Sequence, residues 1–343
     1  MKIKLLIATG DEIYAKLLSD SLSEHYSDIL DVSVCCALEG WSEAEATKNY
    51  DVALFDTLFI EHIKTDRINL PLLLWQDNEP PTEQTGTYEK INKYRRISSI
   101  VAAILEKFAK ISTKNNTEQK HANITAVWSP AGGVGKTSVA IAYALSLTSK
   151  DCTSEGKEVF YLNLEEFSSI PGYFNENGKS ISSVFEMLES REGNVEMFIR
   201  GISSRDKNIS FLSSPENYDD MSILSNENVQ ELVASCAKLA DELIIDLPCA
   251  CDIRVKEIFE TANKVFIVTD GTNAAGIKLT QFMTQNNIYE SIKEKVIIIA
   301  NKDAIINEAK SGTVIALPYL QQINASIICT ILSEHISKVT GLI

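Results

Sequence analysis

The sequence lacks the signals of a metal site, a disulfide framework and a membrane span. Its seven cysteines form no CxxC pair and its four histidines have no partner spacing, so neither a zinc site nor a cystine scaffold is indicated. No stretch reaches the roughly 18 consecutive apolar residues of a transmembrane helix. The opening residues, MKIK, lead into no apolar leader core, and we therefore expect a cytoplasmic protein without a membrane span.

Positive charge is also in short supply. The chain has 32 Lys and Arg against 47 Asp and Glu, which gives a formal net charge of −15. This balance argues against general nucleic-acid binding, because a phosphate backbone is bound by a surface rich in cations. The one obvious basic run, at residues 93–96, is short.

The chain has enough hydrophobic residues to form ordinary packed cores. A length of 343 residues and a hydrophobic content of 45% predict one to three domains. Strand and helix patterns alternate through residues 1–110, which predicts a small doubly wound, flavodoxin-like α/β domain. Residues 111–122 are polar without periodicity and are expected to be a linker. Residues 123–343 are predicted to form a second doubly wound α/β domain with a mostly parallel sheet.

Within the first domain, hydrophobic periodicity predicts the individual elements. An amphipathic helix is expected to close the domain. The expected strands are residues 3–8, 30–36, 51–55 and 70–75, and the expected helices are residues 11–26, 42–48 and 97–109.

The most informative segment is the run WSPAGGVGKTS at residues 128–138. It follows an apolar strand pattern and precedes a helical one, and that order is typical of a phosphate-binding loop. The glycines let backbone N–H groups point at phosphate oxygens, and the helix N-terminus adds partial positive charge. Lys136 can reach the β- and γ-phosphates, and the Thr137 hydroxyl can ligate Mg²⁺. The residues expected to bind ATP here are Gly132, Gly133, Val134, Gly135, Lys136, Thr137 and Ser138.

The match to the usual G-x-x-x-x-G-K-[ST] pattern is incomplete. Pro130 replaces the first glycine, so a strict pattern search would miss the loop. The alternative interpretation is a glycine-rich turn between a strand and a helix, with a surface lysine. Three glycines directly before Lys136 favour the phosphate-binding interpretation.

Two acidic residues downstream are candidates for the rest of the site. Asp246 ends an apolar strand, where a carboxylate could support Mg²⁺, although it could also simply cap the strand. Glu165 follows another apolar strand and could orient an attacking water as a catalytic residue beside Lys136. It could equally be a solvated loop acid.

Together these segments resemble the MinD/ParA group of P-loop ATPases, whose loop reads G-K-G-G-x-G-K-[ST]. The resemblance covers roughly residues 120–343 and implies a P-loop NTPase fold, ATP and Mg²⁺ as ligands, and a homodimer. It also implies that Asn301 hydrogen-bonds adenine and that the backbone near Pro318 flanks the base. Two departures imply slow hydrolysis: Ala131 replaces the lysine that crosses the dimer interface, and Asn163 replaces an acid.

The first domain resembles a response-regulator receiver. Asp56 ends a strand at the phosphoacceptor position, and Lys93 matches the lysine that follows the last strand. Receivers bind Mg²⁺ with two acids after the first strand, but here those positions are Thr9 and Gly10. Without this acid pair, phosphorylation of Asp56 lacks the metal ion that would neutralise phosphate charge. We therefore expect an atypical receiver that binds a protein.

A receiver-like domain followed by a MinD/ParA-like domain resembles the TadZ/CpaE family of pilus-assembly proteins. This resemblance implies an ATP-supported homodimer that sits at a cell pole and recruits the tight-adherence (Flp-type) pilus machinery or polar landmark proteins through its N-terminal domain. Two alternatives remain open: a ParA/MinD-type partitioning or division-site ATPase, and a phosphorylation-controlled response regulator.

Two further expectations concern the second domain. Residues 327–339 have apolar residues at helical spacing with one basic residue, which favours a helix packed on the sheet over a membrane anchor. Cys249 and Cys251, close to Asp246, are expected to be small packing residues.

Overall fold

The computed structural model describes residues 2–27, 29–38, 41, 49–63, 67–76, 83–111, 122–148, 156–175, 179–191, 193–305, 313–321 and 324–340. The chain divides into two compact units, Met1–Thr117 and Glu118–Ile343. This division falls within the segment expected to be a linker. Residue 111 belongs to the last helix of the first unit, whereas residues 112–121 and the helix expected at 42–48 lie outside the described residues.

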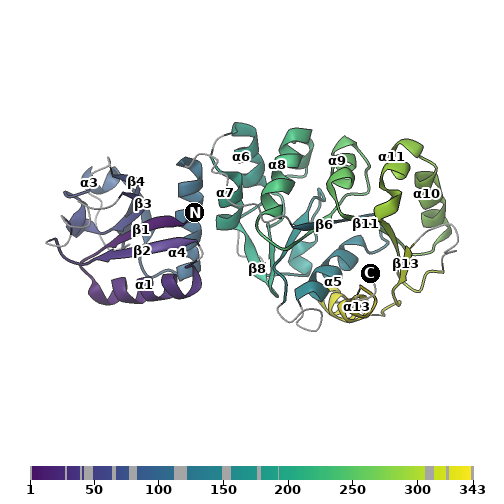
Figure 1. The fold of residues 1–343 in the computed structure, drawn as a ribbon, viewed down its shortest axis with the longest axis horizontal. Helices are drawn as coiled ribbons and strands as arrows, with labels where there is room; N and C mark the ends of the chain where they lie inside the picture. The colour runs from purple at the N-terminus through teal and green to yellow at the C-terminus, as the bar shows by residue number, and fades with distance from the viewer. Residues whose placement is uncertain are drawn as a thin grey trace. The chain divides into compact units, whose positions relative to one another are not determined.

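The first unit is built on a parallel sheet with the strand order β2-β1-β3-β4-β5 (Figure 1). This is the order of flavodoxin-like doubly wound folds. The central strands β1 and β3 are apolar on both faces because the sheet is covered on both sides. The strands are β1 (Ile3–Ala8), β2 (Leu30–Cys35), β3 (Tyr50–Phe55), β4 (Ile68–Trp75) and β5 (Glu89–Asn92).

Two helices of this unit, Glu12–His25 and Ile97–Ile111, begin and end close to the expected residues, whereas the short helix Glu83–Gly86 was not predicted. The side chain of Asp11 caps the first helix by accepting a hydrogen bond from the Tyr14 N–H at 3.0 Å. The closing helix buries an apolar stripe that includes Ile100, Ile104 and Leu105. The helices are α1 (Glu12–His25), α3 (Glu83–Gly86) and α4 (Ile97–Ile111).

The second unit contains a larger sheet with the order β13-β12-β11-β6-β10-β7-β9-β8, parallel except for the β8–β9 pair. The carboxyl ends of its parallel strands therefore lie at one edge of the sheet. The strands are β6 (Asn123–Trp128), β7 (Val159–Asn163), β8 (Ser204–Asp206), β9 (Ile209–Phe211), β10 (Glu242–Asp246), β11 (Lys264–Thr269), β12 (Val296–Ala300) and β13 (Thr313–Ala316).

Helices cover both faces of this sheet. Figure 1 shows α5 and α13 together on one face, with α8 and α9 on the other. The helices are α5 (Lys136–Thr148), α6 (Ser182–Ser190), α7 (Val195–Ile202), α8 (Asn226–Ala237), α9 (Ile253–Thr261), α10 (Asn273–Met283), α11 (Asn286–Ile292) and α13 (Ala325–Thr340).

The last helix, α13, is part of the core rather than a separate amphipathic tail. Its residues Cys329, Leu332 and Ile336 are buried in the cluster that includes the apolar side of α5. The Cys329 thiol also donates to the Ser138 carbonyl at 3.4 Å. A helix packed within the domain was the expectation. Among the described residues, no helix combines the length and the apolar character needed to cross a bilayer.

Candidate functional site

The glycine-rich loop joins the end of β6 to the first residue of α5. Gly133 and Gly135 have positive φ angles of 75° and 95°, in the left-handed region that a residue with a side chain enters only under strain. The Ser129 hydroxyl accepts from the Ala131 N–H at 3.1 Å and so helps to fix the start of the loop. A loop of this shape at a helix N-terminus presents its amides to an anion.

Residues after β12 hold this loop from the outside. The Asn301 side-chain amide donates to the Val134 carbonyl at 2.8 Å, and the Lys302 ammonium donates to the Gly133 carbonyl at the same distance. A Cβ atom at Gly135 would lie 2.6 Å from Asn301 Nδ2, so glycine is needed there for space as well. The Asn301 contact with adenine, and the role of Pro318 just beyond β13, remain predictions.

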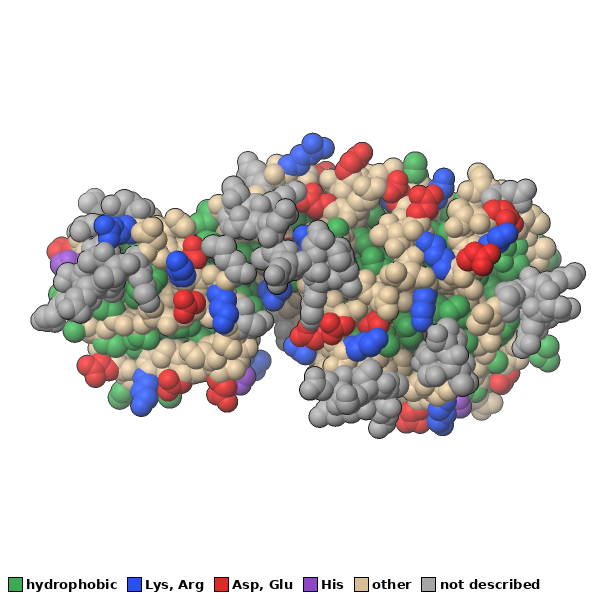
Figure 2. All heavy atoms as spheres, in the orientation of Figure 1, with side chains coloured by type: hydrophobic (Ala, Val, Ile, Leu, Met, Phe, Trp, Pro, Cys, Tyr) green, Lys and Arg blue, Asp and Glu red, His purple; other side chains and the backbone are tan. Residues whose placement is uncertain are grey.

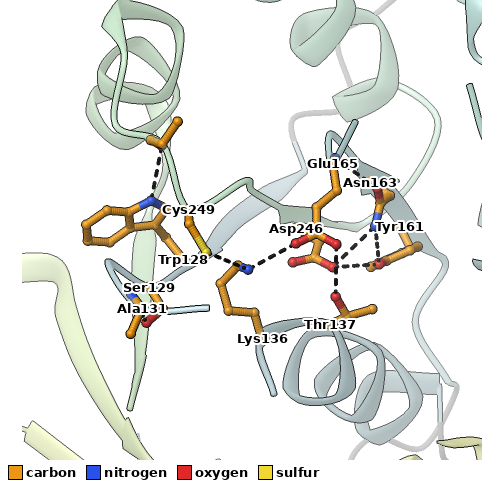
Figure 3. A network of polar contacts seen from close by, with 11 residues as sticks. Trp128, Ser129, Ala131, Lys136, Thr137, Tyr161, Asn163, Glu165, Asp246 and Cys249 are labelled. Atoms are coloured by element: carbon orange, nitrogen blue, oxygen red, sulfur yellow. Dashed lines mark hydrogen bonds and ion pairs between the residues drawn. The ribbon is translucent and has the colours of Figure 1, made fainter. Parts of the chain in front are cut away.

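Lys136 lies at the centre of the site, with its side chain 7% exposed. Its Nζ is 3.0 Å from Glu165 Oε1 and 3.5 Å from Cys249 Sγ (Figure 3). Burial opposes the charge, but the Glu165 carboxylate prevails and raises the pKa of Lys136. Lys136 is therefore a cation at the mouth of the loop, and Glu165 is its partner rather than a solvated loop acid.

Asp246 is the fully buried acid of the site. It ends β10, the neighbour of β6, and Thr137 lies across from it at the start of α5 (Figure 3). Burial, reinforced by the negative charge of Glu165, raises the pKa of Asp246 to about 7. Its Oδ1 atom is buried and has no hydrogen-bond partner. A buried carboxylate oxygen without a donor is available to bind a cation.

The other Asp246 oxygen, Oδ2, is held by two side chains of the adjacent strand β7. The Tyr161 hydroxyl donates to it at 2.9 Å and the Asn163 amide donates to it at 3.3 Å. The sequence interpretation did not identify Tyr161. Its position two residues before Asn163, which puts both side chains on one face of the strand, was the signal that could have found it.

The oxygen atoms of Thr137 and Asp246 fit a site for a magnesium ion that is also bound by phosphates. Mg²⁺ is bound through oxygen ligands, commonly one or two carboxylates plus the phosphates of a nucleotide. The Thr137 hydroxyl and Asp246 Oδ1 supply oxygen atoms beside the loop. In the described part of the chain no three His, Cys, Asp or Glu residues group as a metal-binding cluster. The ion would therefore depend on phosphate ligands as well.

Cys249 and Cys251 differ from the expectation. Both are exposed, so the prediction that they are packing residues was wrong. They lie in the segment between β10 and α9, and Cys249 of this segment contacts Lys136. Another contact that the sequence interpretation missed joins the hydroxyls of Ser138 and Tyr173 at 3.0 Å.

The predicted phosphoacceptor, Asp56, lies in the first unit. Its Oδ2 accepts from the Thr9 hydroxyl at 2.6 Å and from the Gly10 N–H at 3.0 Å, while its Oδ1 accepts from the Leu58 N–H at 3.0 Å. The Lys93 ammonium is 3.7 Å away. The structure thus brings Lys93 and Asp56 together, and it places Thr9 beside Asp56, where receivers have an acid. Phosphorylation of Asp56 remains a prediction.

Comparison with solved structures identifies a known fold over about two thirds of the chain. A ParA family ATPase from Chlorobium tepidum aligns with a TM-score of 0.53 and 16% identity over 65% of this chain and 99% of that chain. A putative plasmid partition protein from Borrelia burgdorferi bound to AMPPNP has a TM-score of 0.47, with 16% identity over 64% of this chain and 98% of its own.

The septum site-determining protein MinD from Pyrococcus horikoshii, complexed with Mg-ADP, has a TM-score of 0.45, with 16% identity over 64% of this chain and 98% of its own. No protein-family model and no curated protein sequence matches this chain. The match to the Chlorobium protein shows the fold alone. The expected resemblance to the MinD/ParA group is therefore confirmed at that level: the chain contains the α/β fold of a ParA-type P-loop ATPase.

Proposed function

We propose that the second unit binds ATP together with Mg²⁺ and acts as a nucleotide-dependent switch. The observation that carries this proposal is the convergence of three features at one edge of the sheet. They are the loop with left-handed Gly133 and Gly135, the buried ammonium of Lys136, and the unpartnered oxygen of Asp246. The ParA-type fold supports the same interpretation.

The pairing of Lys136 with Glu165 suggests how the switch works. Phosphate oxygens in the loop would compete with Glu165 for the Lys136 ammonium, because both are anions that require the same cation. Release of Glu165 would change the segment that follows β7, where Phe167 is 80% exposed. Mg²⁺ would neutralise phosphate charge, while Thr137 and Asp246 would hold it. The residues that bind nucleotide thereby alter a neighbouring surface.

We further propose that nucleotide supports a homodimer with slow hydrolysis, which serves as a localisation factor. The two-unit architecture is the basis for assigning it to assembly of tight-adherence pili at a cell pole, in the manner of the TadZ/CpaE family. The N-terminal unit would bind a pilus-assembly or polar landmark protein. Ala131 at the position of the interface-crossing lysine supports slow turnover.

The direct test is ATP binding by the full chain, measured by calorimetry with Mg²⁺ present. Lys136→Ala is expected to weaken binding by at least about 100-fold, because it removes a buried charge contact to phosphate. Lys278→Ala, which removes an exposed lysine on α10, is the matched control and should bind like the wild type. Undiminished binding by the Lys136 variant would refute the assignment of the loop.

The localisation proposal requires a test in cells. A fluorescent fusion of the full chain should form polar foci, and the Lys136→Ala fusion should lose them. A fusion that is spread over the nucleoid, or retention of the purified protein on duplex DNA or liposomes with ATP, would instead favour a partitioning or division-site ATPase. Acid-labile labelling by a small phosphodonor that is lost in Asp56→Asn would favour the phosphorylation-controlled alternative.

A further inference from the structure

One buried polar chain connects β7 to β10 beneath the proposed Mg²⁺ site (Figure 3). The Asn163 amide donates to the Tyr161 hydroxyl at 3.0 Å, and that hydroxyl donates to Asp246 Oδ2 at 2.9 Å. All three side chains are at most 5% exposed. The Asn163 amide nitrogen can only donate, so the Tyr161 hydroxyl that accepts from it is free to donate to the ionised Asp246, whose orientation is thereby determined by its neighbours.

From this geometry we propose that Tyr161 and Asn163 are positioning residues that aim Oδ1 of Asp246 at the metal ion. The inference rests on the proposed function and deepens it. Both donors engage Oδ2, which leaves Oδ1 as the free oxygen of the carboxylate. Groups that hold a metal ligand in place commonly govern metal affinity almost as strongly as the ligand itself.

The Asn163 amide affects both the orientation of the Asp246 carboxylate and the net charge of the buried cluster. Its nitrogen donates to Asp246, while its oxygen accepts from the Glu165 N–H at 2.9 Å. An ionised aspartate in its place could accept from Glu165 but could not donate to Asp246. It would also put a third carboxylate beside Asp246 and Glu165. Asn163 is therefore the residue type that this buried cluster requires, rather than a defect.

The test separates binding of nucleotide from binding of the metal. ATP affinity of the full chain is measured with excess Mg²⁺ and again with EDTA, for wild type, Tyr161→Phe and Asn163→Asp. We expect both variants to bind ATP in EDTA within about twofold of wild type. The gain in affinity on adding Mg²⁺ should fall by about 10-fold or more in each, within the range known for groups that support metal ligands.

Tyr143→Phe is the matched control, because Tyr143 is another buried tyrosine in the same unit, on α5, and its hydroxyl hydrogen-bonds Thr125. The gain in ATP affinity on adding Mg²⁺ should be the same in this variant as in the wild type. Thermal unfolding of the ligand-free variants shows whether each folds. If Asn163→Asp does not fold, the gain in ATP affinity on adding Mg²⁺ in Tyr161→Phe alone tests the proposal.

Two failures can be told apart. A wild-type chain that binds no ATP in either condition would overturn the proposed function, and this inference with it. Normal binding by the wild type, with an undiminished Mg²⁺ gain in Tyr161→Phe and Asn163→Asp, would overturn this inference alone. A loss of affinity in these variants that is equal with and without Mg²⁺ would also overturn it, because a general structural role would give that result.

Discussion

At the scale of single residues, the site combines groups that are costly for the ligand-free protein. Lys136 and Asp246 are buried beside the half-buried Glu165, and Asp246 lacks a partner for one oxygen. Burial of a charge without full compensation destabilises a folded protein. Such an arrangement is expected where a bound polyanion would pair with Lys136 and a bound cation would pair with Asp246.

The raised pKa of Asp246 predicts a pH-dependent cost in stability. The unfolded chain loses this proton near pH 4, whereas the folded chain retains it until about pH 7, so the folded state binds more protons in between. Its contribution to stability therefore falls as pH rises through this interval and then levels off. Asp246→Asn should raise the free energy of unfolding of the ligand-free chain at pH 8 by about 1 kcal/mol or more, with a clearly smaller effect at pH 4.5.

Denaturant titrations at the two pH values would measure this difference. Glu189→Gln, at an exposed position on α6, is the control and should be neutral at both. The prediction fails if Asp246→Asn changes stability equally at pH 4.5 and pH 8.

The loop glycines allow a sharper comparison between neighbours. Gly135→Ala meets both a positive φ of 95° and a contact of 2.6 Å with Asn301 Nδ2, whereas a Cβ at Gly132 meets no atom within 4 Å. We expect Gly135→Ala to cost about 1–3 kcal/mol of stability and to abolish ATP binding. Gly132→Ala should be close to neutral in stability. Equal melting temperatures for the two variants would contradict this account of the loop.

At the scale of elements, the site depends on which strands are neighbours. β6 lies between β10 and β11, and β7 lies on the far side of β10. Ligand sites in open α/β sheets form at the carboxyl ends of such strands. α5 is held beneath the loop by α13, whose Cys329 contacts the Ser138 carbonyl. The last helix thus supports the first turn of the helix that begins at Lys136.

This packing predicts a large cost for truncation of α13 side chains that face α5. Leu332 is 2% exposed, and Leu332→Ala should lower the free energy of unfolding by about 2–5 kcal/mol. Ile327 on the same helix is 47% exposed, so Ile327→Ala should cost little. Chemical denaturation measures both. A membrane anchor would give the opposite pattern, with little loss of stability for Leu332→Ala and clear retention of the wild type on liposomes.

At the scale of the whole molecule, the chain contains two units built on mostly parallel sheets, and its net charge is −15. In the face shown in Figure 2, blue Lys and Arg side chains are scattered among red Asp and Glu. Two copies of this acidic chain repel each other through their net charge. Their association would therefore depend on shape complementarity and apolar contacts.

Nucleotide should therefore decide the oligomeric state. Sedimentation of the full chain with ATP and Mg²⁺ is expected to show a dimer, and Lys136→Ala should remain monomeric. In the same samples, Ala131→Lys should raise phosphate release by at least about tenfold, because a cation at the interface would stabilise transition-state charge. Ala131→Met, which is long but uncharged, is the control. No gain from the lysine would indicate that another group limits turnover.

Much of the fold could be predicted from the sequence because its signals are local. Alternating strand and helix patterns predicted both α/β sheets, and the spacing of Gly132, Gly133, Gly135 and Lys136 predicted the loop. Asp246 was found because a carboxylate ended an apolar strand. Each of these interpretations depends on residues a few positions apart, for which backbone geometry relates spacing directly to direction.

The tertiary structure alone decided which of these residues meet. Asn163 and Asp246 are 83 residues apart, and they become neighbours because β7 pairs with β10 rather than with β6. Parallel pairing needs long crossover connections, so no local pattern reports which strands are adjacent. The i, i+2 spacing placed Tyr161 on the same strand face as Asn163, but only the folded chain showed that this face meets Asp246 and that the Asn301 amide reaches Val134.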